Sequence, residues 1–227
     1  MAKTYQITII NESEASQQYA LFNQVPSVSP TVSTGVWNNA LSVISLEHGE
    51  TVLFTLNDQS YAFVGSSSKT PGTDGATVIP SDFENVSLGG LNTTGGEQKG
   101  TTLKTGIFQW FFKFTGENAP IGGEGAFAVD TPLDFTLQNA LEDNWVFGFG
   151  KSVGGQPVAA ATITPQPGNS YQITPVNTWY ITYGPYVQGQ ILKIDEARTP
   201  TVAIDFSQLP PEVTVVHFQD GTFAIRQ

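Results

Sequence analysis

Hydrophobic and polar residues alternate along much of this chain, and the clearest example is the segment 107–114. One face of this segment, read at a period of two, is entirely aromatic and consists of Phe108, Trp110, Phe112 and Phe114. Such alternation in residues with high β-propensity predicts a strand with one buried face. We therefore expect a single strand over 106–115 that buries Trp110, and the same argument places Trp145 in the core.

Shorter runs of the same kind recur along the chain, separated by turn residues. They predict strands at 4–11, 17–23, 42–47, 50–57, 60–65, 106–115, 124–130, 133–138, 144–150, 157–164, 169–175, 177–183, 190–195, 201–206, 213–218 and 221–226. Asn57-Asp58 predicts a turn and Asp220-Gly221 a tight hairpin, while 138–143 could form one helical turn. The pattern predicts an all-β fold, an antiparallel β-sandwich or barrel-like double sheet with many short strands and little or no helix.

Residues 66–105 differ from the rest because they are rich in Gly and Ser and poor in large apolar residues. We expect an irregular excursion there, with short strands near 77–79 and 85–88. The excursion lacks the charged, Pro-rich composition of a linker, so we expect one large β domain over 1–227; a split into two β subdomains within 66–105 is the alternative. Tyr-Gln-Ile-Thr occurs at both 5–8 and 171–174, which leaves an internal duplication open.

Charge narrows the possible partners. The chain carries a net charge of −11, and its nine Lys and Arg residues are scattered singly. Phosphate neutralisation requires clustered cations, so we expect no nucleic-acid binding and no docking to anionic membranes. A neutral small molecule or a glycan remains compatible with this composition, and homo-oligomerisation stays open.

The chain contains no cysteine, which excludes disulfides, thiolate catalysis and Cys-based metal sites. Its first residues enter a strand pattern directly and do not have the regions of a signal peptide. We therefore expect a soluble protein that is cytoplasmic, or one that is exported and whose leader is missing from this sequence. No apolar run is long enough to cross a bilayer as a helix.

Two motif matches fail in their context. Gly150-Lys151-Ser152-Val153-Gly154 fits the Gly-x-Ser-x-Gly pattern of hydrolases, but that turn requires a helix after the serine, and β-like sequence follows here. The Gly150-Lys151-Ser152 part also resembles the end of a phosphate-binding loop, but Trp145 stands where that motif needs Gly. We expect a glycine-rich hairpin loop.

Neither histidine predicts a metal site. His48 lies in a turn and His217 in a strand, and neither has a second His at ligand spacing. Six carboxylates gather between 117 and 143: Glu117, Glu124, Asp130, Asp134, Glu142 and Asp143. A carboxylate pair could support glycoside hydrolysis, but solvated turn residues are the simpler interpretation. We predict no catalytic residue, metal or cofactor, and whether these groups converge in space is left open.

Aromatic residues give the best functional hypothesis. Segment 177–186 places Trp179 and Tyr183 on one strand face and ends in a Gly-Pro turn with Tyr186, while Trp37 lies in a loop-like setting. Sugar rings stack on such side chains while nearby Asn and Thr bind their hydroxyls. We expect Trp37, Trp179, Tyr183 and Tyr186 to contribute to one ligand platform.

The sequence therefore predicts a non-catalytic, lectin-like protein that recognises a carbohydrate. Three other classes remain: a β-rich pore-forming or lipid-binding defence protein, a carboxylate-based hydrolase, and a self-assembling structural protein. The amphipathic segment 107–114 and the polar excursion 66–105 support the second class, because a hairpin from either could enter a membrane.

Overall fold

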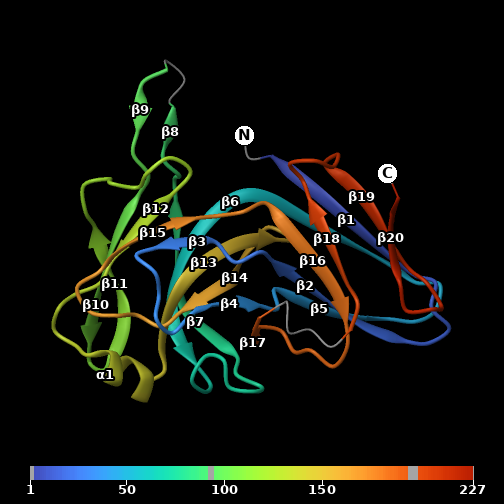
Figure 1. The fold of residues 1–227 in the computed structure, drawn as a ribbon, viewed down its shortest axis with the longest axis horizontal. Helices are drawn as coiled ribbons and strands as arrows, with labels where there is room; N and C mark the ends of the chain where they lie inside the picture. Colours follow the sequence, from blue (N-terminus) through green and yellow to red (C-terminus); the bar gives the residue numbers. More distant parts are fainter. Residues whose placement is uncertain (1–2, 92–94, 194–198, 227) are drawn as a thin grey trace.

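The computed structural model describes residues 3–91, 95–193 and 199–226. Their regular secondary structure is almost entirely β-strand, in a sandwich-like arrangement of mostly antiparallel sheets (Figure 1). The all-β prediction is confirmed. A single short helix, α1 (Leu137–Glu142), interrupts the strands within the described ranges.

The largest sheet has nine strands among the described residues and orders eight of them β17-β4-β14-β13-β6-β1-β19-β20, while β7 pairs with β6. Its strands are β1 (Thr4–Asn11), β4 (Val36–Asn39), β6 (Thr51–Ser67), β7 (Val78–Val86), β13 (Trp145–Val153), β14 (Gln156–Ile163), β17 (Ile191–Leu192), β19 (Glu212–His217) and β20 (Phe223–Arg226). β1 shows why such segments form strands here: its side chains alternate between buried and partly exposed, as the period of two requires.

Part of this sheet curls until it closes on itself. β7 is bridged to the segment before β17 at Thr77 and Gln190, where Val78 N donates to Gly189 O at 2.8 Å. β17 in turn pairs with β4. We call the closed set β6, β7, β17, β4, β14 and β13 the strand ring. Gly150 helps to close it, because a Cβ at this position would lie only 3.2 Å from the Phe83 ring.

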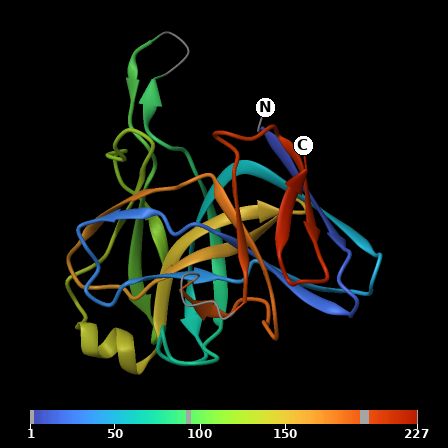
Figure 2. The ribbon, with the colours of Figure 1, turned by 45° about the vertical axis from the view of Figure 1, so that its right-hand side comes forward.

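Three smaller sheets complete the described fold. One orders β11-β10-β12-β15-β3, a second orders β18-β16-β2-β5, and β8 with β9 forms a projecting finger (Figures 1 and 2). Their strands are β2 (Gln17–Asn23), β3 (Ser27–Ser29), β5 (Ser42–Leu46), β8 (Gly90–Leu91), β9 (Glu97–Gln98), β10 (Thr102–Phe108), β11 (Phe111–Glu117), β12 (Phe127–Asp130), β15 (Ser170–Thr174), β16 (Thr178–Tyr183) and β18 (Thr201–Asp205).

The main core takes buried side chains from all three larger sheets, for example Ile7, Phe127 and Trp179. A second cluster, which includes Phe63 and Val146, fills the strand ring. Large apolar and aromatic side chains therefore fill both the space between the sheets and the inside of the strand ring. The many Phe residues of the chain supply much of this buried volume.

Several predicted elements differ from the structure. The turn expected at Asn57-Asp58 is absent, and β6 continues through it because a bulge, marked by a register shift opposite Lys151 and Ser152, absorbs the extra residues. The strands expected near 77–79 and 85–88 are the two ends of β7. No strand forms at 133–138.

Other local predictions are confirmed. Asp220-Gly221 joins β19 to β20, with Gly221 at φ 81°. The helical turn expected at 138–143 is α1, which begins after a capping box in which Thr136 Oγ1 accepts from Asn139 N. The two Tyr-Gln-Ile-Thr segments lie on β1 and β15, in different sheets. No helix in the described ranges is long and apolar enough to cross a membrane.

Candidate functional site

The four residues predicted to form a ligand platform do not lie on one surface. Trp179 is 0% exposed, and its Nε1 donates to Asn177 Oδ1 at 3.1 Å. It is a core residue, because β16 is paired on both edges, by β2 and β18, and its inner face packs against the main core. The prediction of Trp179 as a ligand-stacking residue is corrected on this point.

Tyr183 and Tyr186 are both half-buried and pack on the main core. The Tyr183 ring lies 4.4 Å from the His217 ring, and the Tyr186 ring meets Phe22 edge-on at 5.7 Å. Both tyrosines thus support neighbouring core rings, and only part of each side chain reaches solvent.

His217 lies at the centre of a buried aromatic cluster. Its Nδ1 and Tyr19 Oη are hydrogen-bonded at 2.8 Å, and Phe223 stacks on its ring at 4.7 Å. The other ring nitrogen, Nε2, is enclosed without a partner. Burial lowers the pKa of His217, although nearby Asp220 opposes this. A neutral, enclosed imidazole of this kind packs the interior and is not positioned to act on a ligand.

Trp37 is the fourth predicted residue; it lies on β4 of the strand ring and packs on a different cluster from the other three. Its Nε1 donates to Thr34 O at 3.1 Å, and Lys193 Nζ lies 5.1 Å from the ring. Gly72 allows the ring to lie where it does, because a Cβ there would be 2.4 Å from it. Trp37 packs against the apolar cluster that fills the strand ring.

The most exposed aromatic residues gather at the turn of the β10–β11 hairpin. We call residues 108–111 the aromatic tip. Its exposed fractions are 54% for Phe108, 82% for Trp110 and 71% for Phe111. The turn lies at the corner of the molecule occupied by α1, in both views of the fold (Figures 1 and 2).

The backbone of the aromatic tip is unusual. Phe108 pairs with Phe111, so Gln109 and Trp110 form a two-residue turn, with φ of 48° and 72°. Two positive φ values are typical of a type I′ turn, where Asn and Gly are preferred. Gln and Trp pay a steric penalty in this conformation, and such strain is concentrated at functional sites.

Side chains of the neighbouring strands contact the aromatic tip. Trp145 Nε1 donates to Trp110 O at 3.1 Å, and the Phe112 ring stacks on Trp145 with centroids 6.0 Å apart. Lys113 Nζ lies 3.9 Å from the centre of the Phe108 ring. The backbone below the exposed rings is therefore hydrogen-bonded to the buried side chain of Trp145, on which the buried Phe112 ring stacks.

Sequence reasoning missed this site because it treated 106–115 as one strand. The turn at Gln109-Trp110 leaves Phe112 buried and Phe114 half-buried, and it exposes Phe108 and Trp110. The prediction that Trp110 is buried is wrong, whereas the prediction for Trp145 is confirmed. No Gly, Pro, Asn or Asp marks the turn, so the usual signal was missing.

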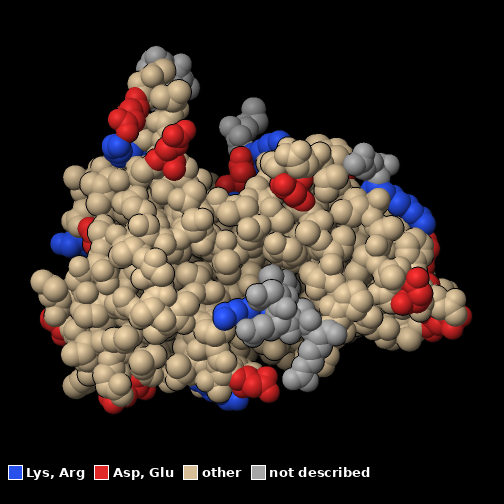
Figure 3. All heavy atoms as spheres, viewed as in Figure 1, with Lys and Arg blue, Asp and Glu red and all other residues tan. Residues whose placement is uncertain are grey.

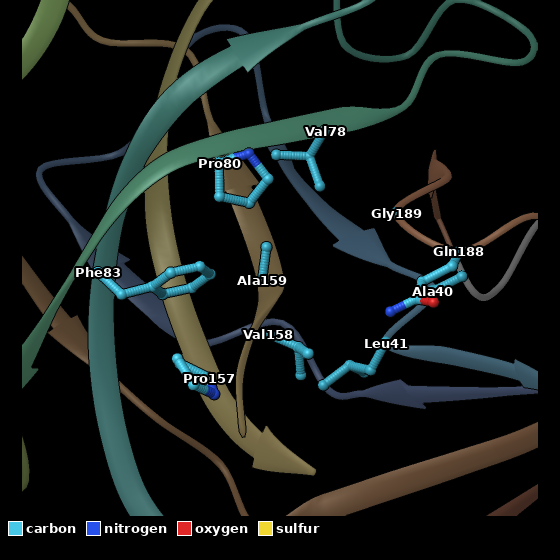
Figure 4. A pocket seen from close by; sticks show the side chains of 10 residues that line it. All are labelled: Ala40, Leu41, Val78, Pro80, Phe83, Pro157, Val158, Ala159, Gln188 and Gly189. Carbon is cyan, nitrogen blue, oxygen red and sulfur yellow. The ribbon is translucent and has the colours of Figure 1, made fainter. Parts of the chain in front are cut away.

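A shallow apolar groove of about 240 Å³ opens at one end of the strand ring (Figure 4). Val78, Pro80 and Phe83 of β7 face β14 across it, and Leu41 and Gln188 close its other side. Its lining carries no charged side chain. The groove could hold a small apolar group, but it has few polar atoms to orient one.

The histidines and carboxylates do not form a metal cluster among the described residues. Within the described ranges, no three His, Asp or Glu side chains are placed to hold a metal. His48 Nδ1 contacts Ser13 O at 2.5 Å, whereas His217 binds Tyr19. Segment 150–154 is the end of β13 followed by a Gly154-Gly155 turn into β14, so the hairpin interpretation of this segment is confirmed.

Charged side chains are sparse on the face shown in Figure 3, where they stand singly or in small groups. The amino-acid sequence matches the family model RhiA over residues 2–227, which is nearly the whole chain. No curated protein matches it, and no solved structure does. The chain belongs to the RhiA family.

Proposed function

We propose that this protein is a non-catalytic binding protein that recognises a neutral carbohydrate, and that the aromatic tip is its contact surface. The observation that carries the proposal is the exposure of Phe108, Trp110 and Phe111 together on a turn with two positive φ values. Exposing three large rings forgoes their burial, which stabilises a folded chain by roughly 1.5–3 kcal/mol per ring. A binding partner that covers them recovers this free energy.

The chemistry of the turn suits a sugar. Trp110 offers a broad face for the C–H side of a pyranose ring, and the exposed Gln109 amide next to it can donate to and accept from hydroxyl groups. Because Trp145 holds the backbone of the turn, the turn loses little backbone freedom on binding.

A second candidate function is docking to a zwitterionic lipid surface. The specific observation in its favour is that two of the three exposed rings are Phe, which cannot bond to hydroxyls, and that Lys113 lies against one of them. The third ring, Trp110, belongs to a residue type that is enriched at the membrane–water interface. The net charge of −11 argues against strongly anionic lipids.

The test is a glycan array probed with labelled wild type, Trp110→Ala and Leu91→Ala, followed by titration of any sugar that binds. Leu91 is the matched control, because it is also a large exposed apolar residue but lies on the β8 finger. We expect binding of one sugar class by wild type and Leu91→Ala, and at least about a tenfold loss in Trp110→Ala.

Co-sedimentation with phosphatidylcholine vesicles separates the two candidates. A blank array together with vesicle binding that Trp110→Ala removes would support the lipid surface and overturn the carbohydrate. Equal sugar binding by all three proteins would overturn the aromatic tip as the contact surface.

A further inference from the structure

Lys151 is a lysine in the interior of the sheet. It lies on β13, between β6 and β14, and is 4% exposed. Lysine is almost never buried to this degree unless it has a charged or hydrogen-bonding partner. Among the described residues, no protein atom accepts a hydrogen bond from its Nζ.

Apolar side chains flank Lys151 on β13 and β14. Its cross-strand partner on β14 is Val158, and the Phe149 ring lies 5.3 Å from Nζ on the same face. β14 carries no titratable side chain. Asp58, an exposed residue at the bulge of β6, is the charged group that acts on the amine.

A second unpartnered polar side chain lies on the neighbouring strand β6. Ser60 is the cross-strand partner of Lys151 on β6, so both side chains leave the same face of the sheet at neighbouring positions. Ser60 is 3% exposed, and its Oγ has no hydrogen-bond partner. An enclosed hydroxyl without a partner is costly, and a ligand bound at Lys151 could give it one.

Burial lowers the pKa of Lys151 to about 8, because the ammonium form loses its hydration, and Asp58 offsets only part of this. At pH 7.5 roughly a quarter of the amine is then unprotonated, compared with well under 1% for an ordinary lysine. An unprotonated lysine amine in an apolar setting is the nucleophile that forms Schiff bases with carbonyl compounds.

We propose that Lys151 is a covalent attachment site for short aliphatic aldehydes, which it binds as an imine. The Nζ lone pair attacks the carbonyl carbon, and one N–H proton passes to the oxygen to give a carbinolamine. The C–O bond then breaks, the hydroxyl leaves as water with the second N–H proton, and the C=N bond forms, so one water is released and nothing is oxidised or reduced. Ser60 Oγ supplies a hydrogen bond to the hydroxyl, and Val158 and Phe149 contact the alkyl chain. This site is independent of the aromatic tip and of the proposed function.

The experiment treats the intact protein with propanal and cyanoborohydride at pH 7.5 and maps the propylated lysines by peptide mass spectrometry. Lys104, which is exposed on β10, is the reference within the same molecule. The comparison therefore uses the wild-type protein alone and does not depend on the folding of a variant. We expect Lys151 to be labelled about ten times faster than Lys104. Its rate should reach half of its maximum near pH 8.

Two variants extend the test. Lys151→Arg keeps the positive charge but removes the reactive amine, and should leave only the slow labelling of exposed lysines. Ser60→Ala should lower the rate at Lys151 severalfold. Labelling of Lys151 no faster than that of Lys104, or a half-maximum above pH 10, would overturn the proposal, and an unchanged rate in Ser60→Ala would overturn the role of Ser60.

Discussion

Two aromatic segments, the β10–β11 hairpin and β16, both differ in exposure from what their sequences predict. Trp110 of the hairpin is predicted to be buried and is exposed, whereas Trp179 of β16 is predicted to contact a ligand and is buried. The hairpin segment 107–114 has the stronger amphipathic pattern, yet it carries the most exposed rings of the pair. Segment 178–183 mixes Trp and Tyr with Thr, and yet Trp179 is wholly enclosed. Both segments are rich in aromatic residues, so aromatic content alone does not set their exposure.

The position of each segment in its sheet sets the exposure of its aromatic side chains. β16 is paired along both edges, by β2 and β18, and its inner face packs on the main core. β11 forms the edge of its sheet, and the hairpin turns back before its aromatic run is complete. Periodicity thus tells which residues share a face, but the neighbours of the strand decide whether that face is covered.

Replacing a tryptophan in each segment should give the largest difference between the two segments, in the free energy of unfolding. Trp179→Ala should lower the free energy of unfolding by about 3–5 kcal/mol, because it leaves a large cavity in the core. Trp110→Ala should change it by no more than about 0.5 kcal/mol, because the ring is in solvent. Urea denaturation followed by circular dichroism measures both, and similar losses in the two variants would contradict the contrast.

The turn of the aromatic tip gives the next largest effect. Replacing Gln109-Trp110 by Asn-Gly should raise the free energy of unfolding by about 1 kcal/mol, because both new residues tolerate positive φ. Thermal and urea unfolding measure the gain. The control is Gln109→Asn alone, which should give only part of it. A loss of stability would show that the contacts of Trp110 outweigh the backbone strain.

Acid should weaken the region around Tyr183 and leave the aromatic tip unaffected. Burial lowers the pKa of His217, so as the pH falls below about 6.5 the unfolded chain binds a proton that the folded chain does not. The stability due to neutral His217 is therefore complete above that pH and is lost as the pH falls through its folded-state pKa.

Unfolding free energies of wild type and His217→Asn, measured between pH 7 and 5, check this effect. The wild type should lose more stability over this interval than the variant does. Parallel curves would assign the acid sensitivity to carboxylates instead of His217.

Fluorescence quenching gives the smallest effect, with no change in stability expected. Trp110 is exposed, Trp37 is half-buried, and Trp145 and Trp179 are enclosed. Trp110→Phe should therefore remove most of the emission that iodide quenches. If the quenchable fraction stays the same, the tip tryptophan is covered in solution.

Much of the strand pattern was predictable from the sequence. β1 and β2 occupy the predicted segments 4–11 and 17–23, and α1 forms where one helical turn was expected. The sequence signals for these elements are local, because alternation, capping residues and turn residues define where each one begins and ends. The bulge that carries β6 past Asn57-Asp58 was not predictable, because it depends on pairing with β13.

The candidate site was less predictable for a related reason. The turn at Gln109-Trp110 has no sequence signal, and its conformation is stabilised by Trp145, which is distant in sequence. The unpartnered state of Lys151 likewise depends on Ser60 and Val158, which lie on two other strands. Where the neighbours come from distant strands, a single sequence identifies the residues but not their surroundings.

The parallel pairing of β1 with β19 has a consequence for synthesis. β6 follows β1 closely along the chain, but Ile7 pairs with Val213 on the other edge of β1, so this edge stays open until Val213 has left the ribosome. An open apolar edge is a template for pairing with other nascent chains. Fragments that end before residue 212 should therefore aggregate during expression, and folding should be completed only after translation has passed β19.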